Sequence, residues 1–254
     1  MKISVPNSWE ELTPYQQREL IHIISNVKGV DFMEDYIRIV QILLMKKNTL
    51  WHWFRMRWIL RNIPISAFQE AVDFLTKPPT LHTFPKIKGL VAPADRLGDV
   101  SIEQFSLCDT ILHRYYKEKN EKQRKKYQRQ LVAVLYRLPA EVPTFDKGKL
   151  PQIARISDKI TEKEVQRIVF IFTSIMQYIT SVYPKIFKSP KNENQPQFAP
   201  RHTPFSQIIT MMAADELRLL GNLKECQNTL VYDFFNALLE SKRIHEIKAK
   251  ALKK

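Results

Sequence analysis

Five prolines between residues 184 and 204 are the strongest constraint on how this chain can fold. Each proline lacks a backbone N–H donor, and its ring clashes with the preceding helical turn, so this stretch cannot form one continuous helix. Few apolar side chains lie between the prolines, which leaves little surface to bury. The sequence therefore predicts a loop or linker at 184–204, which separates a helical N-terminal domain at 1–183 from a C-terminal helical module at 205–254.

The whole chain of 254 residues contains 15 prolines but only 5 glycines. The scarcity of glycine disfavours Gly-rich phosphate-binding loops and turn-rich all-β folds. Many prolines suit helices joined by stiff connectors. We expect a mainly α protein, a multi-helix bundle with the C-terminal module. A pairing of residues 2–5 with 86–92 would add at most a small two-stranded β element.

Apolar residues recur at helical spacing through most of the chain. Thr13-Pro14 and Thr203-Pro204 combine a capping residue with a proline at the first helical position, and Thr161 with Glu164 forms a capping-box pattern. Irregular connectors are expected at 77–99 and 140–158. The expected helices cover 14–28, 32–45, 49–61, 66–76, 101–116, 117–138, 162–182, 205–220 and 229–252.

Two segments raise the question of membrane contact. The first holds three tryptophans and three arginines within 51–61, which is compatible with an interfacial membrane helix. Because this segment is apolar nearly all round, burial in the bundle is the favoured interpretation. The second, 168–183, is uncharged but shorter than the ~20 residues of a membrane span. A buried core helix is expected there, and no membrane partner is expected.

Net charge of +14 favours polyanions or acidic partners. The cations concentrate in a basic run at 117–129, interrupted by Glu118 and Glu121, and recur in the tail at 242–254. Lysines and arginines could contact phosphates, while interleaved tyrosines could stack on bases. The tyrosines suit the core face of a helix equally well, and a solvated charged face is the favoured interpretation of the run. The candidate nucleic-acid-binding residues are Lys122, Arg124, Lys125, Lys126 and Arg129.

The sequence contains no recognisable catalytic motif. It lacks a nucleophile elbow, a phosphate-binding loop and a zinc-protease motif, and its six histidines are scattered. Cys108 and Cys226 are too few for a disulfide framework and favour free thiols in a reducing compartment. We expect no enzyme activity, no metal site and no cofactor. The opening residues also lack the apolar core of a secretion signal.

Three stretches resemble virion-morphogenesis proteins of tailed phages and prophages, of the tail-assembly-chaperone kind. They are the opening VPNSWEELTPYQQREL, a middle block FPKIKGLVAPADRLGDVSIEQFSLCDTILHRYY that is followed later by LVAVLYR, and the end FSQIITMMAADELRLLGNLKECQNTLVYDFFNALLESK. The end combines the small residues Ala213 and Ala214 with a Gly-Asn turn and a last helix. The basic run at 117–129 is not part of the pattern, and no catalytic residues carry over.

The resemblance implies a non-enzymatic structural or assembly protein that acts through protein–protein contacts. Its partners would be phage-like tail or virion proteins, with self-association left open, and it would work in the cytoplasm during assembly or within a particle. A basic nucleic-acid-binding protein is the alternative. The candidate partner-binding residues lie in the last helix and the Pro-rich loop: Phe234, Phe235, Leu238, Ile186, Phe187 and Phe198. Ordinary core packing is the favoured interpretation for each of these residues individually.

Overall fold

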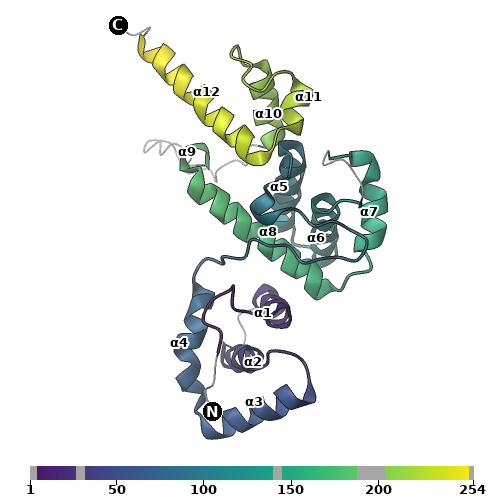
Figure 1. Cartoon of the computed structure of the whole chain (residues 1–254), viewed down its shortest axis with the longest axis vertical. Coiled ribbons are helices and arrows are strands. Elements are labelled where there is room, and N and C mark those ends of the chain that lie inside the picture. Colours follow the sequence, from purple (N-terminus) through teal and green to yellow (C-terminus); the bar gives the residue numbers. More distant parts are fainter. Residues whose placement is uncertain (1–4, 27–31, 140–144, 188–203, 252–254) are drawn as a thin grey trace. The chain divides into compact units, whose positions relative to one another are not determined.

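The computed structural model describes residues 5–26, 32–139, 145–187 and 204–251, and it confirms a mainly α protein (Figure 1). Within these residues there are helices and no strands. Short 3-10 turns are η1 (Ile65–Phe68), η2 (Asp73–Thr76), η3 (Asp95–Leu97) and η4 (Lys147–Lys149). The α-helices are α1 (Pro14–Asn26), α2 (Phe32–Leu44), α3 (Leu50–Asn62), α4 (Gln69–Val72), α5 (Ile102–Lys117), α6 (Glu121–Leu135), α7 (Leu150–Ser157), α8 (Glu162–Val182), α9 (Pro184–Phe187), α10 (Phe205–Ala214), α11 (Leu223–Asn228) and α12 (Val231–Ala251).

The described residues do not show the expected two-stranded β element, and residues 2–4 of its first half, 2–5, lie outside them. Val91, from the expected second half, instead exchanges backbone hydrogen bonds with Arg137 at 2.8 and 3.0 Å, which forms an isolated bridge. A similar bridge joins Ser101 to Leu230. Both bridges tie segments between helices together without forming a strand.

The chain forms two compact units, and they do not divide at the Pro-rich stretch. Unit 1 contains residues 1–82 and 161–175, and unit 2 contains 83–160 and 176–254. The expected module at 205–254 therefore belongs to the same unit as α5, α6 and α7. A proline pattern shows where a helix must stop, but it does not show which helices pack together.

Unit 1 consists of α1 to α4 and the first part of α8. Trp9 is 3% exposed and packs its indole on Phe74 and Phe170, with ring centroids 5.6 and 5.1 Å away. Helix α1 packs on α2, and α2 packs on α3. Val40 and Leu44 of α2 share a buried cluster with Met56 and Ile59 of α3. These contacts make one small helical core.

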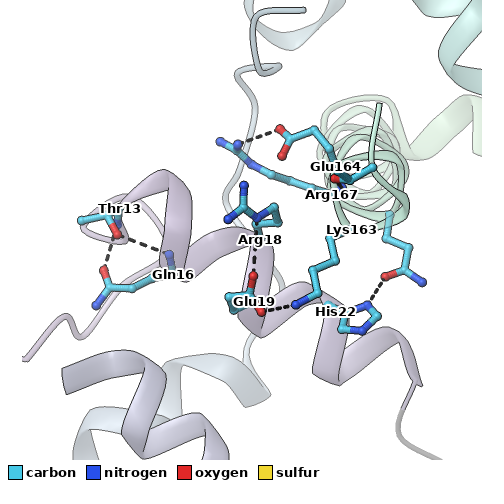
Figure 2. A network of polar contacts seen from close by, with 10 residues as sticks. Thr13, Gln16, Arg18, Glu19, His22, Lys163, Glu164 and Arg167 are labelled. Carbon is cyan, nitrogen blue, oxygen red and sulfur yellow. Dashed lines mark hydrogen bonds and ion pairs between the residues drawn. The ribbon is translucent and has the colours of Figure 1, made fainter. Parts of the chain in front are cut away.

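Polar contacts join α1 to the start of α8 within unit 1 (Figure 2). Lys163 pairs with Glu19, and His22 Nδ1 lies 2.6 Å from the Gln166 side-chain oxygen. Arg167 donates to the side-chain oxygen of Gln17 at 2.7 Å. Because each group has a partner on the opposite helix, this network orients α8 on α1.

The expectation that segment 51–61 is buried in the bundle is wrong for its three tryptophans. Met56 and Ile59 are buried, whereas Trp51, Trp53 and Trp58 are exposed. Helical spacing identifies residues that share a face, but it cannot tell which face packs on the neighbouring helix. In this helix the smaller apolar residues face the core.

Unit 2 is built around a cluster of aromatic rings from different helices. Phe105 of α5 lies 5.2 Å from Phe205 of α10 and 5.6 Å from Phe235 of α12, measured between ring centroids. Helices α10, α11 and α12 all contact α5. On its other side α5 packs on α6, which in turn packs on α7. Helix α5 is thus the central helix of this unit.

Several helix boundaries differ from the expected ones. A break at residues 118–120 separates α5 from α6, because the Glu118 carboxylate accepts hydrogen bonds from the backbone N–H groups of Lys119 and Asn120. The expected connector at 140–158 contains α7. The helix expected at 205–220 ends at Ala214 and is followed by α11. The stretch at 184–187 forms the single turn α9, while the rest of the Pro-rich segment, 188–203, lies outside the described residues.

Among the described helices, α8 is the one long and apolar enough to cross a bilayer by length and composition. Over half of its apolar window, 56%, is buried inside the protein. Ile168, Phe172, Ile175 and Ile179 are fully buried. This burial is typical of the core helix expected from the sequence.

Candidate nucleic-acid interface

The basic run, 117–129, covers the last residue of α5, the break after it and the first half of α6, and α5 and α6 pack antiparallel. Ser101 caps α5 by accepting from the backbone N–H of Gln104, and Asn120 caps α6 by accepting from that of Gln123. The buried amide of Gln104 donates to the carbonyls of Val134 at 2.7 Å and Leu135 at 3.2 Å. These bonds satisfy carbonyls at the end of α6, which otherwise have no helical partner. The register of the two helices is thereby fixed.

Helix α6 has a polar first half and a buried second half, as the sequence predicts. Residues 131–135 are buried, whereas most of residues 121–130 are exposed or half-buried. Lys122, Lys125, Lys126 and Arg129 are spaced at i, i+3, i+4 and i+7, so they share one face of the helix. The same face continues into Ala133 in the buried half.

Arg124 lies on a different face of α6 from this basic stripe. Its guanidinium lies over the ring of Tyr115, 4.7 Å from the centroid, and donates to the Tyr115 hydroxyl at 3.1 Å. Gln128, one turn later, donates to the same hydroxyl at 3.3 Å. Arg124 and Tyr115 thus bind each other and join α6 to α5.

The basic stripe forms one wall of a groove of about 1120 Å³ between α5, α6 and α7. Arg114 at the end of α5 and Lys147 in η4 bring further cations to the same groove. Leu150, Pro151 and Ala154 of α7 supply an apolar lining. Among the described residues, six basic side chains line the groove and Asp158 is the single acidic one.

Some of the groove cations are partly neutralised. Arg129 lies 3.9 Å from the Asp158 carboxylate and donates to the Asp158 backbone carbonyl at 3.2 Å. Lys147 lies 2.6 Å from Glu103, and Lys125 lies 3.6 Å from Glu121. Arg129 therefore also holds α6 against the end of α7.

The other three groove cations, Arg114, Lys122 and Lys126, are exposed. Within the part of the chain that the structure describes, they form no ion pair with an acidic residue. None of the described residues that line the groove is aromatic. These residues therefore offer cations for phosphate groups but no ring on which a base could stack.

The structure thus brings together four of the five residues predicted for nucleic-acid binding and places Arg124 elsewhere. Sequence reasoning missed Arg114 and Lys147. Arg114 follows Ile111 by three residues in α5, so helical spacing could have placed it on the same face as this groove-lining residue. Lys147 could not be found this way, because it follows an irregular segment.

The basic C-terminal tail is more neutralised than the groove. Arg243 donates two hydrogen bonds to Glu240, at 2.9 and 2.6 Å, and Lys248 lies 3.7 Å from Glu216. Lys242 donates to the backbone carbonyl of Lys185. The last residues, 252–254, lie outside the described residues.

The predicted partner-binding residues of the last helix are not exposed. Phe234 and Phe235 are fully buried in the aromatic core, and Leu238 is 7% exposed. The expectation that they present a free surface is wrong, because the inward face of α12 packs on α5 and α9. Phe187 is half-buried, with its ring 5.9 Å from Phe205, and Phe198 lies outside the described residues.

Leu238 and Ile186 do line a mostly apolar pocket of about 650 Å³ between α9, α10 and α12. Its rim includes Met211, which is 70% exposed. Two of the six predicted partner-binding residues thus line this pocket, and of these Ile186 is half-buried and Leu238 is buried.

Asp215, Ser241 and His245 meet at the edge of this pocket, but not as a catalytic triad. Ser241 donates to Asp215 at 2.5 Å, and His245 Nε2 lies 3.1 Å from the same carboxylate. A triad needs the imidazole between the hydroxyl and the carboxylate, whereas the carboxylate lies in the middle here. The Ser241 hydroxyl, helped by the Leu217 backbone N–H, lowers the pKa of Asp215. The cluster links the end of α10 to α12.

The two cysteines are free and buried. Complete burial raises the pKa of the Cys108 thiol well above its ordinary value, and the neighbouring Asp109 carboxylate adds to the effect. Burial also raises the pKa of Cys226. A reactive cysteine needs its thiolate form and solvent access, so neither residue is suited to nucleophilic chemistry. Among the described residues, no group of three or more His, Cys, Asp or Glu side chains could hold a metal ion.

Comparison with known proteins found no matching family model, no matching curated protein and no matching solved structure.

Proposed function

We propose that this protein binds the phosphodiester backbone of nucleic acid in the groove between α5, α6 and α7, without catalysing a reaction. The observation that supports this most strongly is the convergence of six basic side chains from three elements on one groove. A solvated charged face would be expected to spread its cations over one helix. Here Arg114, α6 and Lys147 approach the same space.

Arg114, Lys122 and Lys126 would contact phosphates directly, since they are exposed and have no acidic partner among the described residues. Arg129 and Lys147 would either leave the carboxylates of Asp158 and Glu103 to bind phosphates, or keep these ion pairs and stabilise the fold. Because none of the described residues lining the groove is aromatic, bases would not be stacked there, and contacts of lysine and arginine with phosphates carry no sequence information. The protein would therefore bind nucleic acids of different sequence with similar affinity.

The test compares two variants that lose the same charge from one arginine and two lysines. R114Q/K122Q/K126Q removes the three groove cations, and R243Q/K248Q/K250Q removes three from α12. Fluorescence anisotropy with labelled DNA should show weaker binding for the groove variant and little change for the α12 variant. If both variants lost DNA affinity equally, only the total charge of the protein would matter, and the groove would be rejected as the binding site.

A second candidate function is assembly of a phage-like particle through protein–protein contacts, and the apolar pocket between α9, α10 and α12 favours it. Ile208 and Met211 of α10 line this pocket beside Leu238 and Ile186. An apolar segment of a tail or virion protein would fit there. The three stretches that resemble virion-morphogenesis proteins support the same assembly function.

This second function is tested with I208E/M211E, which places two charges in the pocket. The variant should stop co-purifying with a tail or virion protein and should still bind DNA. L219E/L223E, at two exposed positions of unit 2, is the control. If I208E/M211E retained the partner, the pocket would not be the contact site.

A further inference from the structure

The outward face of α3 carries large apolar side chains. Trp51, Phe54 and Trp58 expose 64%, 63% and 55% of their surface, and Leu50 exposes 78%. Their spacing of i, i+3 and i+7 places the three aromatic residues on one face. Met56 and Ile59 face the other way, into the buried cluster with α2. The helix is therefore held by its smaller apolar side chains and presents its largest ones outward.

Positive charge accompanies this aromatic face without any acidic residue nearby in sequence. From residue 36 to residue 69 there is no Asp or Glu. Arg57 follows Phe54, and Arg61 follows Trp58, by three residues each, so both arginines neighbour the aromatic side chains on the helix surface. The Arg57 guanidinium lies 4.7 Å from the ring centroid of Trp53, and that of Arg55 lies 5.8 Å from that of Trp51.

We propose that α3 is an interfacial helix that binds the surface of a bilayer containing anionic lipids. Tryptophan prefers the boundary between headgroups and acyl chains, where its ring is apolar and its N–H is solvated. Phe54 and Leu50 would enter the acyl boundary, while Arg57 and Arg61 would contact lipid phosphates. A cation–π contact keeps the charge of Arg55 beside Trp51, and a second one keeps the charge of Arg57 beside Trp53, which adjoins this face.

The same observations disfavour other occupants of this face. A second copy of the chain would bring like-charged arginines together, which opposes association. An acidic protein would need a matching apolar groove with a carboxylate rim for this one convex helix. A bilayer offers an apolar layer and an anionic layer over any convex shape, so it complements both features of α3 at once.

The experiment is flotation of the full chain with vesicles of phosphatidylcholine, with and without phosphatidylserine. Three of the four tryptophans lie on α3, so their emission should shift to shorter wavelength when phosphatidylserine vesicles are added. W51A/F54A/W58A should lose flotation and the shift, and R57Q/R61Q should weaken binding by about fivefold for each arginine removed. The R114Q/K122Q/K126Q variant should still float, which separates this inference from the groove function.

M211A/L219A/L223A removes three exposed apolar side chains elsewhere and should float like the unchanged protein. Circular dichroism checks that W51A/F54A/W58A remains helical, as expected for exposed positions. The inference is overturned if the unchanged protein does not float or if W51A/F54A/W58A floats normally. It is also overturned if sedimentation shows that α3 mediates self-association instead.

Discussion

Phe235 lies among aromatic rings from four other segments of unit 2. Its ring centroid is 5.1 Å from that of Tyr183, 5.6 Å from those of Phe105 and Phe187, and 5.7 Å from that of Phe205. A ring in such surroundings contributes through buried area and edge contacts. Truncating it would leave a cavity that neighbouring helices cannot fill completely.

Phe235→Ala should therefore lower the free energy of unfolding by about 3–5 kcal/mol, measured by urea denaturation. Phe54→Ala makes the same chemical change at a position that is 63% exposed, and it should change stability by at most about 0.5 kcal/mol. If the two variants lost similar amounts of unfolding free energy, the burial of Phe235 in α12 would be contradicted.

Asp215 links stability to pH. Hydrogen bonds from Ser241 and the Leu217 backbone lower its pKa from the ordinary value of 3.8, so folding favours the charged form. Its stabilisation is fully present above the unfolded-state pKa and is lost as pH falls through the lower folded-state pKa. The stability advantage of the unchanged protein over Asp215→Asn should thus be constant near pH 5 and shrink on further acidification. Denaturation at successive pH values measures this, and an advantage that grew in acid would contradict it.

At the scale of elements, the turn before α11 requires a glycine. Gly221 has a φ of +75°, and an added Cβ would lie 2.1 Å from the Glu225 carboxylate oxygen. That carboxylate accepts from the Asn222 backbone N–H at 2.7 Å as part of a capping box. A side chain at position 221 would strain the backbone and displace the cap.

Gly221→Ala should destabilise unit 2 by about 1–2 kcal/mol from backbone strain alone. Gly98→Ala is the matched control, because Gly98 has a φ of −62° and its nearest contact would be 3.4 Å away. Thermal unfolding followed by circular dichroism compares the two variants. A neutral Gly221→Ala variant would show that this turn does not require a left-handed residue.

Most helices could be predicted from capping residues and apolar spacing, and the failures have physical causes. Thr13-Pro14 and Ser101 mark helix starts locally, so the sequence identifies α1 and α5. The break before α6 depends on Glu118 turning back to the backbone, which helical periodicity does not register. Spacing grouped Trp51 with Trp58 correctly, but their exposure depends on how α3 packs on α2. The basic stripe on α6 could be predicted from helical spacing. The groove could not, because one of its walls is α7, whose residues were expected to form an irregular connector.

At the scale of the whole molecule, positive charge is distributed unevenly. Unit 2 holds 28 of the 40 Lys and Arg residues but only 16 of the 26 Asp and Glu residues, so it accounts for +12 of the net +14. Unit 1 is nearly neutral, with a local basic segment at 36–69. A positive field around unit 2 would attract a polyanion to the groove and speed the encounter.

The dependence of DNA affinity on salt tests the groove most directly. Each phosphate contact releases a counterion, so the slope of log K against log salt falls by about 0.9 for each lost contact on duplex DNA. If Arg114, Lys122 and Lys126 each contact a phosphate, the slope for R114Q/K122Q/K126Q should be shallower by about 2.7. The slope for R243Q/K248Q/K250Q should remain close to that of the unchanged protein. An unchanged slope for the groove variant would contradict nucleic-acid binding in the groove.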